Sequence, residues 1–100
     1  MIIAQESIAI SNTAKSFSDF TKSATIKGKA TSFLLQAGLG GNVRVTFDGS
    51  TTATNAVGLR LLSAGMPPME VLKEDVLRIS FIRETNDSTL EVGYVAGNSF

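Results

Sequence analysis

The stretch that decides the fold runs from Asn42 to Gly65, NVRVTFDGSTTATNAVGLRLLSAG. From Val43 to Asp48 apolar and polar side chains alternate, which is the two-residue period of a strand with one buried face. Leu59 and Leu61 continue this alternation beyond a polar, threonine-rich loop that opens with an Asp-Gly turn. The stretch therefore predicts two strands joined by a loop, the central hairpin of a β-sandwich.

Further short segments resemble strands and are separated by turn-forming residues. We expect strands at residues 2–10, 24–28, 31–37, 42–48, 58–64, 69–72, 75–83 and 89–96, with 69–72 at a sheet edge. The inward residues expected in the last two long strands are Leu77, Ile79, Phe81, Leu90, Val92 and Tyr94. About seven or eight short strands without a long helical pattern predict an all-β fold, an antiparallel two-sheet sandwich or jelly roll.

Residues 11–23 are rich in serine and threonine and carry no sustained apolar stripe. Phe17 and Phe20 stand three apart, a spacing that fits one helical turn or a plug at the end of a sandwich. We expect a loop that covers the core here, and residues 1–23 are alternatively an extended arm. The length of 100 residues predicts a single domain over 1–100.

Composition excludes several classes of function. The apolar fraction of 43% and charged fraction of 18% predict a globular chain, and nine basic residues balance nine acidic ones. Without a basic excess, we expect neither nucleic acid nor an anionic membrane as a partner. The chain has no cysteine or histidine, which removes disulfides, serine–histidine and cysteine–histidine nucleophiles and histidine metal sites. The start, MIIAQES, predicts no signal peptide, so we expect synthesis without export.

Three candidate sites have simpler structural interpretations. The run from Gly38 to Gly41 precedes a strand rather than the lysine-led helix of a phosphate loop, so it predicts a turn with positive φ angles. Asp48 is the one carboxylate of its loop, too few for calcium, and we expect it to accept backbone hydrogen bonds. The other acids lie beside turns or at outward positions, unlike a glycosidase pair. We predict no catalytic, cofactor or metal site, and no enzyme.

Some apolar residues fall where alternation places outward side chains. Together with the first two isoleucines they predict a patch covered by another subunit, made of Ile2, Ile3, Leu34, Leu62, Ile82 and Val95. The alternative is that both faces of the central strands are buried within the chain.

The order of the pieces FLLQAG, NVRVTFDGSTTATNAVGLRLLSAG and DVLRISFIRETNDSTLEVGYVAG resembles small structural proteins of tailed bacteriophage particles. The elements that carry the resemblance are Val43 to Gly49, Thr52 to Thr54, Gly58 to Gly65, Leu77 to Ile82 and Leu90 to Tyr94. It covers the chain from Phe33 onward, about the last two-thirds. The first thirty residues do not contribute to it.

The resemblance implies a non-enzymatic β-sandwich protein of the virion. Its first implied role is a capsid cement or decoration protein, usually a homotrimer, which sits on the capsid surface and braces the major capsid protein. Such a protein is synthesised in the host cytoplasm. A tail, collar or fibre-associated protein is the second role in that class. A host-surface carbohydrate-binding module is the alternative from another class, although Tyr94 is expected inward and only loop phenylalanines such as Phe17 or Phe100 could serve as platforms.

Overall fold

Two four-stranded antiparallel sheets pack together in the structure, a computed structural model that describes residues 1–64 and 66–97. The first sheet has the order β1-β8-β3-β6 and the second sheet β2-β7-β4-β5. In chain order the elements are β1 (Ile2–Ile10), β2 (Lys15–Ser16), the 3-10 turn η1 (Phe17–Asp19), α1 (Ala24–Lys29), β3 (Ser32–Ala37), β4 (Val43–Thr46), β5 (Leu59–Leu61), β6 (Met69–Leu72), α2 (Lys73–Val76), β7 (Ser80–Arg83) and β8 (Ser88–Val95). The predicted all-β, two-sheet sandwich is confirmed.

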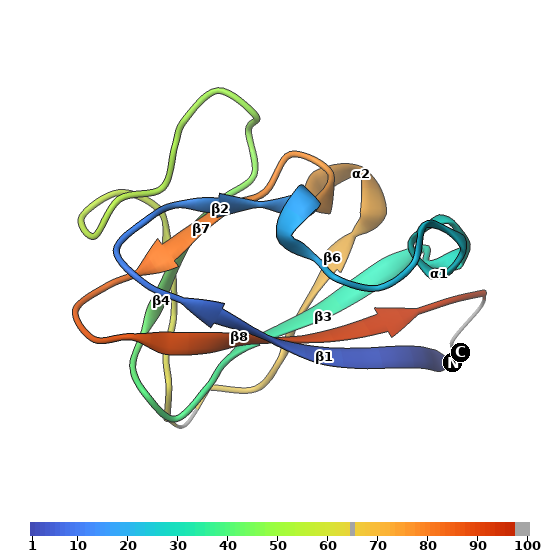
Figure 1. The fold of residues 1–100 in the computed structure, drawn as a ribbon, viewed down its shortest axis with the longest axis horizontal. Helices are drawn as coiled ribbons and strands as arrows, with labels where there is room; N and C mark the ends of the chain where they lie inside the picture. The colour runs from blue at the N-terminus through green and yellow to red at the C-terminus, as the bar shows by residue number, and fades with distance from the viewer. Residues whose placement is uncertain (65, 98–100) are drawn as a thin grey trace.

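The longest strands form the centre and one edge of the first sheet. Figure 1 shows β1, β8 and β3 running along the length of the molecule, with α1 and α2 near one end and β2, β7 and β4 toward the other. In the second sheet β4 pairs with β5 in antiparallel register, Val43 opposite Leu61, so the predicted hairpin is confirmed. The predicted edge position of β6 is also confirmed. No helix of the described residues is long and apolar enough to span a membrane.

The strand predicted at residues 24–28 is wrong, because this segment forms the helix α1. Ser23 caps the helix: its side-chain oxygen accepts a hydrogen bond from the backbone N–H of Ile26 at 3.3 Å. A serine cap satisfies one of the free N–H groups of the first turn. Lys27 and Lys29 lie in the last turn, where a cation is favourable. These capping signals outweigh the weak strand pattern.

The strand predicted at 75–83 is wrong in its first half, where α2 precedes the shorter strand β7. Val76 and Ile79 are buried three residues apart, whereas Leu77, which we expected inward, is 52% exposed. The backbone N–H of Leu77 donates to the carbonyl of Lys73 at 3.0 Å, a helical bond. Residues 77–81 alternate between apolar and polar as a strand does, but the first of them continue the helical turn. Only the residues from Ser80 onward belong to the strand β7.

The segment 11–23 covers the core, as expected, and it includes one short helical turn, η1, which is one of the arrangements that fit the spacing of Phe17 and Phe20. The N–H of Ser16 donates to the carboxylate of Asp19 at 2.9 Å and so fixes the turn. Phe20, directly after it, is only 1% exposed. Residues 2–10, which the arm interpretation would leave free, lie in the first sheet as β1, where all but the bulge residue Ile3 pair with β8.

Phe20 contacts both sheets within the core that they share. Its ring centroid lies 6.0 Å from that of Phe33 and 6.3 Å from that of Tyr94, both on the first sheet. It also lies 6.0 Å from Phe81 on the second sheet and 5.1 Å from Phe17. These separations fall in the range of favourable tilted and edge-to-face aromatic pairs.

A carboxylate joins this core to the edge strand β1. The hydroxyl of Tyr94 donates to Glu6, and the backbone N–H of Thr21 donates to the same carboxylate at 3.0 Å. Burial raises the pKa of Tyr94 above its ordinary value, and the bond to Glu6 adds to this. Burial also acts to raise the pKa of Glu6, but the hydrogen bonds from Thr21 and Tyr94 outweigh it and hold the pKa below its ordinary value. Glu6 therefore stays ionised while it ties three segments together.

The turn at Gly38 to Gly41 forms as expected, but the positive φ angles do not. Among the described glycines, positive φ occurs at Gly49, Gly58 and Gly97. A Cβ on Gly40 would lie 2.6 Å from the carbonyl oxygen of Asp87, so the turn needs glycine because another backbone approaches it. This close approach packs the β3–β4 turn on the β7–β8 turn.

We predict that Phe20→Ala lowers the free energy of unfolding by about 3–5 kcal/mol, because it empties the space between the sheets. The measurement is urea denaturation followed by fluorescence of Tyr94 or by circular dichroism. Leu39→Ala is the matched control, since Leu39 is 96% exposed, and it should change stability by no more than about 0.5 kcal/mol. Equal losses in the two variants would contradict a core centred on Phe20.

We also predict opposite effects for two glycine-to-alanine substitutions. Gly40→Ala destabilises the fold, because the added methyl meets the Asp87 backbone at 2.6 Å. Gly28→Ala stabilises it by up to about 1 kcal/mol, because Gly28 lies in α1 with no atom within 4 Å of its would-be Cβ. Thermal unfolding of the pair measures both signs, and a Gly40→Ala protein as stable as wild type would refute the close approach.

Candidate functional site

The candidate site lies on the outer surfaces of the two sheets. Within the described residues no group of three or more histidine, cysteine, aspartate or glutamate side chains could hold a metal ion. Asp48 instead accepts hydrogen bonds from the backbone N–H groups of Ser50 at 3.0 Å and Thr51 at 2.8 Å, which confirms its predicted turn role. The hydroxyl of Thr51, with these N–H groups, lowers the pKa of Asp48 to about 2.

The structure does not bring the six predicted interface residues into one patch. Ile2, Leu34 and Val95 lie on the outer face of the first sheet, whereas Ile82 lies on β7 of the second sheet and Leu62 directly follows β5. Ile3 occupies a bulge in β1 and packs against the core. Val95 is only 4% exposed, so the chain itself covers it. The predicted residues that lie at the surface therefore fall on two separate sheets.

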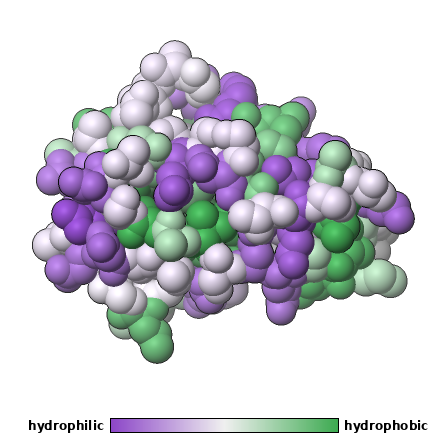
Figure 2. Space-filling model, viewed as in Figure 1, coloured by the Kyte–Doolittle hydropathy of each residue, from purple (hydrophilic) through white to green (hydrophobic). Residues whose placement is uncertain are grey.

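The outer face of the first sheet carries its side chains in rows across the strands. The three central rows are Ser7, Glu91, Gln36; then Gln5, Gly93, Leu34, Glu70; then Ile2, Val95, Ser32, Leu72. Leu72 is 57% exposed and extends the apolar part of this face to the edge strand β6. Sequence alternation alone could not have assigned it here, because a four-residue strand shows too little pattern. Figure 2 shows hydrophobic surface where β1 begins and beside α2, with hydrophilic surface between them.

A groove crosses this face above Gly93, where the absent side chain leaves a dip in the sheet. The groove, called the Gly93 groove below, has a volume of about 450 Å³, and its lining includes Leu34, Gln5, Pro68 and Glu91. The hydroxyl of Ser7 donates to Oε1 of Glu91 at 2.9 Å. Oε2 of Glu91 is buried and accepts no hydrogen bond from any residue that the structure describes.

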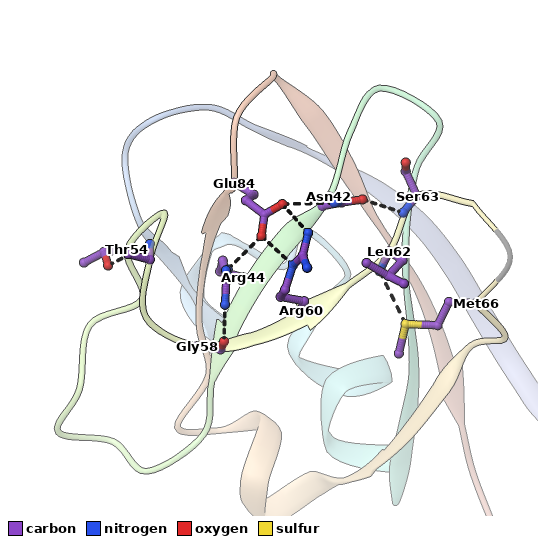
Figure 3. Close-up of polar contacts among 10 residues, drawn as sticks. Asn42, Arg44, Thr54, Gly58, Arg60, Leu62, Ser63, Met66 and Glu84 are labelled. Carbon is purple, nitrogen blue, oxygen red and sulfur yellow. Dashed lines mark hydrogen bonds and ion pairs between the residues drawn. The ribbon is translucent and has the colours of Figure 1, made fainter.

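The second surface is organised by a carboxylate shared between two arginines (Figure 3). Arg44 and Arg60 face each other directly across β4 and β5, an arrangement of like charges that is unfavourable by itself. Arg60 donates to both carboxylate oxygens of Glu84, at 2.7 and 2.9 Å. Nε of Arg44 lies 2.9 Å from the same carboxylate in an ion pair without hydrogen-bond geometry. Glu84 thus relieves the repulsion, and the cluster keeps one net positive charge.

Hydrogen bonds around this cluster hold the hairpin together. Asn42 donates its amide N–H to Glu84 at 3.0 Å, and its amide oxygen accepts from the N–H of Ser63 at 2.9 Å. Arg44 donates to the carbonyl of Gly58 at 2.9 Å, which anchors the end of the loop 49–57. The hydrogen bonds from Arg60 and Asn42 lower the pKa of Glu84 to about 2. The same ion pair raises the pKa of Arg60 above its ordinary value.

A hollow of about 420 Å³ lies beside the cluster, between the loop 49–57 and β7. Ile82 contributes its apolar part, and the amides and hydroxyls of Asn12, Thr54, Asn55 and Thr85 surround it. Thr54 and Val57 exchange two backbone hydrogen bonds, at 3.1 and 3.2 Å, which close the loop tip. In Figure 1 this loop, drawn in green, protrudes from the second sheet. The hollow offers amides and hydroxyls as hydrogen-bonding groups.

Comparisons with protein families, curated proteins and solved structures returned no match to this chain.

The pKa of Glu84 is lowered from its ordinary value of 4.5 to about 2. We therefore predict that the free energy of unfolding falls as the pH drops through this range. The ionised group stabilises the folded state above its unfolded pKa, and this contribution is lost as the pH falls through its folded pKa. Urea denaturation at several pH values in this window measures the effect. Glu84→Gln should flatten the profile in part, since Asp48 titrates over a similar range.

Glu74→Gln is the control for this experiment, because Glu74 is an exposed acid on α2 outside the cluster. Its pH profile should run parallel to that of the wild type. Parallel profiles for the wild type and Glu84→Gln would instead show that the shared carboxylate does not stabilise the hairpin.

Proposed function

We propose that this chain is a non-enzymatic structural protein of a tailed-phage virion, a cement or decoration protein that binds the capsid surface and stabilises the lattice of the major capsid protein. The observation that carries the proposal is the order of the elements from Phe33 onward, which resembles that of such proteins. In the structure these elements belong to one sandwich, as β3, the β4–β5 hairpin with its loop, β7 and β8, with β6 and α2 between the hairpin and β7. The proposed form is a homotrimer, as the resemblance implies.

The distribution of chemistry in the chain supports a binding role. The aromatic cluster around Phe20 fills the space between the sheets, so the sandwich presents its outer faces and loops to partners. The described surfaces offer amides, hydroxyls, ion pairs and exposed leucines, which are groups that protein interfaces use. A virion subunit needs repeated contacts of this kind and no reaction.

We assign the capsid contact to the loop 49–57. Asp48 fixes its beginning through the bonds to Ser50 and Thr51, and Ala53 is buried with its N–H donating to the Ser80 hydroxyl at 3.0 Å. The tip, with Val57 45% exposed, projects beyond these anchors. A loop that is already ordered loses little conformational entropy when a partner binds. The loop is therefore suited to recognition.

A carbohydrate-binding role is the candidate from another class, and it lacks an aromatic platform in the described part of the chain. Tyr94 is fully buried in the core. Phe17 packs on Phe20, and the ammonium of Lys27 lies 4.9 Å above its ring. Phe100, the other phenylalanine considered from the sequence, lies outside the described residues. A tail, collar or fibre position would use the same surfaces as capsid binding.

The test is co-sedimentation with emptied heads of a tailed phage whose genome carries the coding sequence. The wild-type protein should bind saturably and raise the temperature at which the heads disrupt. Val57→Asp should weaken binding at least about tenfold, because a charge enters the contact of the loop tip. Leu39→Asp, a similar change at the exposed β3–β4 turn, is the matched control and should bind as the wild type does.

A wild-type protein that stays in the supernatant at saturating concentrations would overturn the capsid proposal. Binding that both variants reduce equally would overturn the assignment of the loop. A glycan array with specific hits, together with no head binding, would favour the carbohydrate alternative.

A further inference from the structure

Asp48 and Gly49 form a dipeptide that can rearrange by itself. Asp48 is the one aspartate or asparagine of the sequence that is followed by glycine. Because glycine carries no side chain, its backbone nitrogen can approach the carboxyl carbon of the preceding aspartate closely. Both residues are exposed, at the start of the loop 49–57. The sequence and the exposure therefore allow a reaction between the Asp48 side chain and the Gly49 backbone.

This reaction is the formation of isoaspartate, and it needs no reagent other than water. The nitrogen of Gly49 bonds to Cγ of Asp48, while the carboxyl OH and the amide proton leave together as water. Water then opens the resulting succinimide ring. Opening at the backbone carbonyl of Asp48 leaves the main chain running through Cγ, which lengthens it by one methylene where it enters the loop 49–57.

The folded chain holds the Asp48 carboxylate in its unreactive form. Oδ1 accepts hydrogen bonds from the backbone N–H groups of Ser50 at 3.0 Å and Thr51 at 2.8 Å, and Oδ2 accepts one from the Thr51 hydroxyl at 2.6 Å. The Thr51 hydroxyl contributes most to lowering the pKa of Asp48 to about 2. Ring closure proceeds from the neutral carboxyl group, whose OH can leave, so hydrogen bonds that favour the ionised form slow the reaction.

The same turn explains why glycine stands at this reactive position. Gly49 has a φ of 78°, a conformation that glycine adopts without the steric cost that a side chain brings. The hydroxyl of Thr46 donates to the carbonyl of Thr51 at 2.6 Å and so ties the turn to β4. The backbone thus requires glycine after Asp48, and Thr51 is held where its hydroxyl reaches the carboxylate.

We propose that Asp48–Gly49 is the site at which this chain forms isoaspartate, and that the hydroxyl of Thr51 restrains the reaction in the folded protein. The other aspartates precede Phe20, Val76 and Ser88, whose side chains hinder the attacking nitrogen. The inference concerns the chemistry of the chain itself and does not depend on capsid binding.

The experiment incubates the purified full-length chain in mildly acidic buffer made with heavy-oxygen water. Each opening of the succinimide ring adds one heavy oxygen, which mass spectrometry of the peptide between Arg44 and Arg60 localises to residue 48. Thr51→Val removes the hydroxyl and keeps the backbone N–H, so it should speed the exchange at least about threefold in the folded protein. Wild type unfolded in concentrated urea should also exchange faster than folded wild type.

Thr52→Val is the matched control, because Thr52 is also exposed and its hydroxyl makes no hydrogen bond among the described residues, so it should exchange as the wild type does. Circular dichroism shows whether each variant is folded. Equal exchange in folded and unfolded wild type would overturn the restraint, and so would a folded Thr51→Val protein that exchanges as slowly as the wild type. Faster exchange at another aspartate of the unfolded chain would overturn the choice of Asp48.

Discussion

The fold depends on one aromatic side chain that belongs to neither sheet. Phe20 follows a short turn in a serine-rich connection, yet its ring contacts Phe33 and Tyr94 on one sheet and Phe81 on the other. A sandwich of this size buries a modest core, so a connection that contributes a large ring has a large share in its stability. The Glu6 carboxylate extends the constraint outward, because it accepts hydrogen bonds from Tyr94 and Thr21 and so fixes the edge strand to the core.

The hairpin from β4 to β5 is held by a different kind of force. Its apolar side reaches the core through Val43, Val45 and Leu61, while its outer side sets two arginines against each other. Glu84, from the segment after β7, neutralises this repulsion, so three strands of the second sheet depend on one carboxylate. Gly58 then completes the loop, since its φ of 130° and the nearby Val45 backbone exclude a side chain. The hydroxyl-rich loop is thereby a rigid projection of the sheet.

Sequence reasoning succeeded where strands are buried on one face and failed where short helices interrupt them. The period of two located β3, β4 and β8, because inward residues such as Leu35, Val45 and Val92 alternate with polar ones. It misassigned α1 and α2, since helices of six and four residues carry too few apolar positions to show their own period. The predicted interface residues were identified as outward, but alternation carries no information about which sheet a strand joins, so Leu34 and Ile82 were grouped although the topology separates them.

The separation of these two surfaces has a consequence for how the chain can function. Residues that hold the sheets together face inward, whereas Glu91 and Gly93 lie on the outer face of the first sheet, opposite Ser7 and Gln5 of β1. Glu91 and Gly93 nevertheless alternate with Val92 and Tyr94 on β8, which pairs with both β1 and β3. A groove on a central strand is as rigid as the sheet around it. A rigid site loses little conformational entropy when a ligand binds. The central strand β8 therefore gives the outer face of the first sheet its most firmly held part.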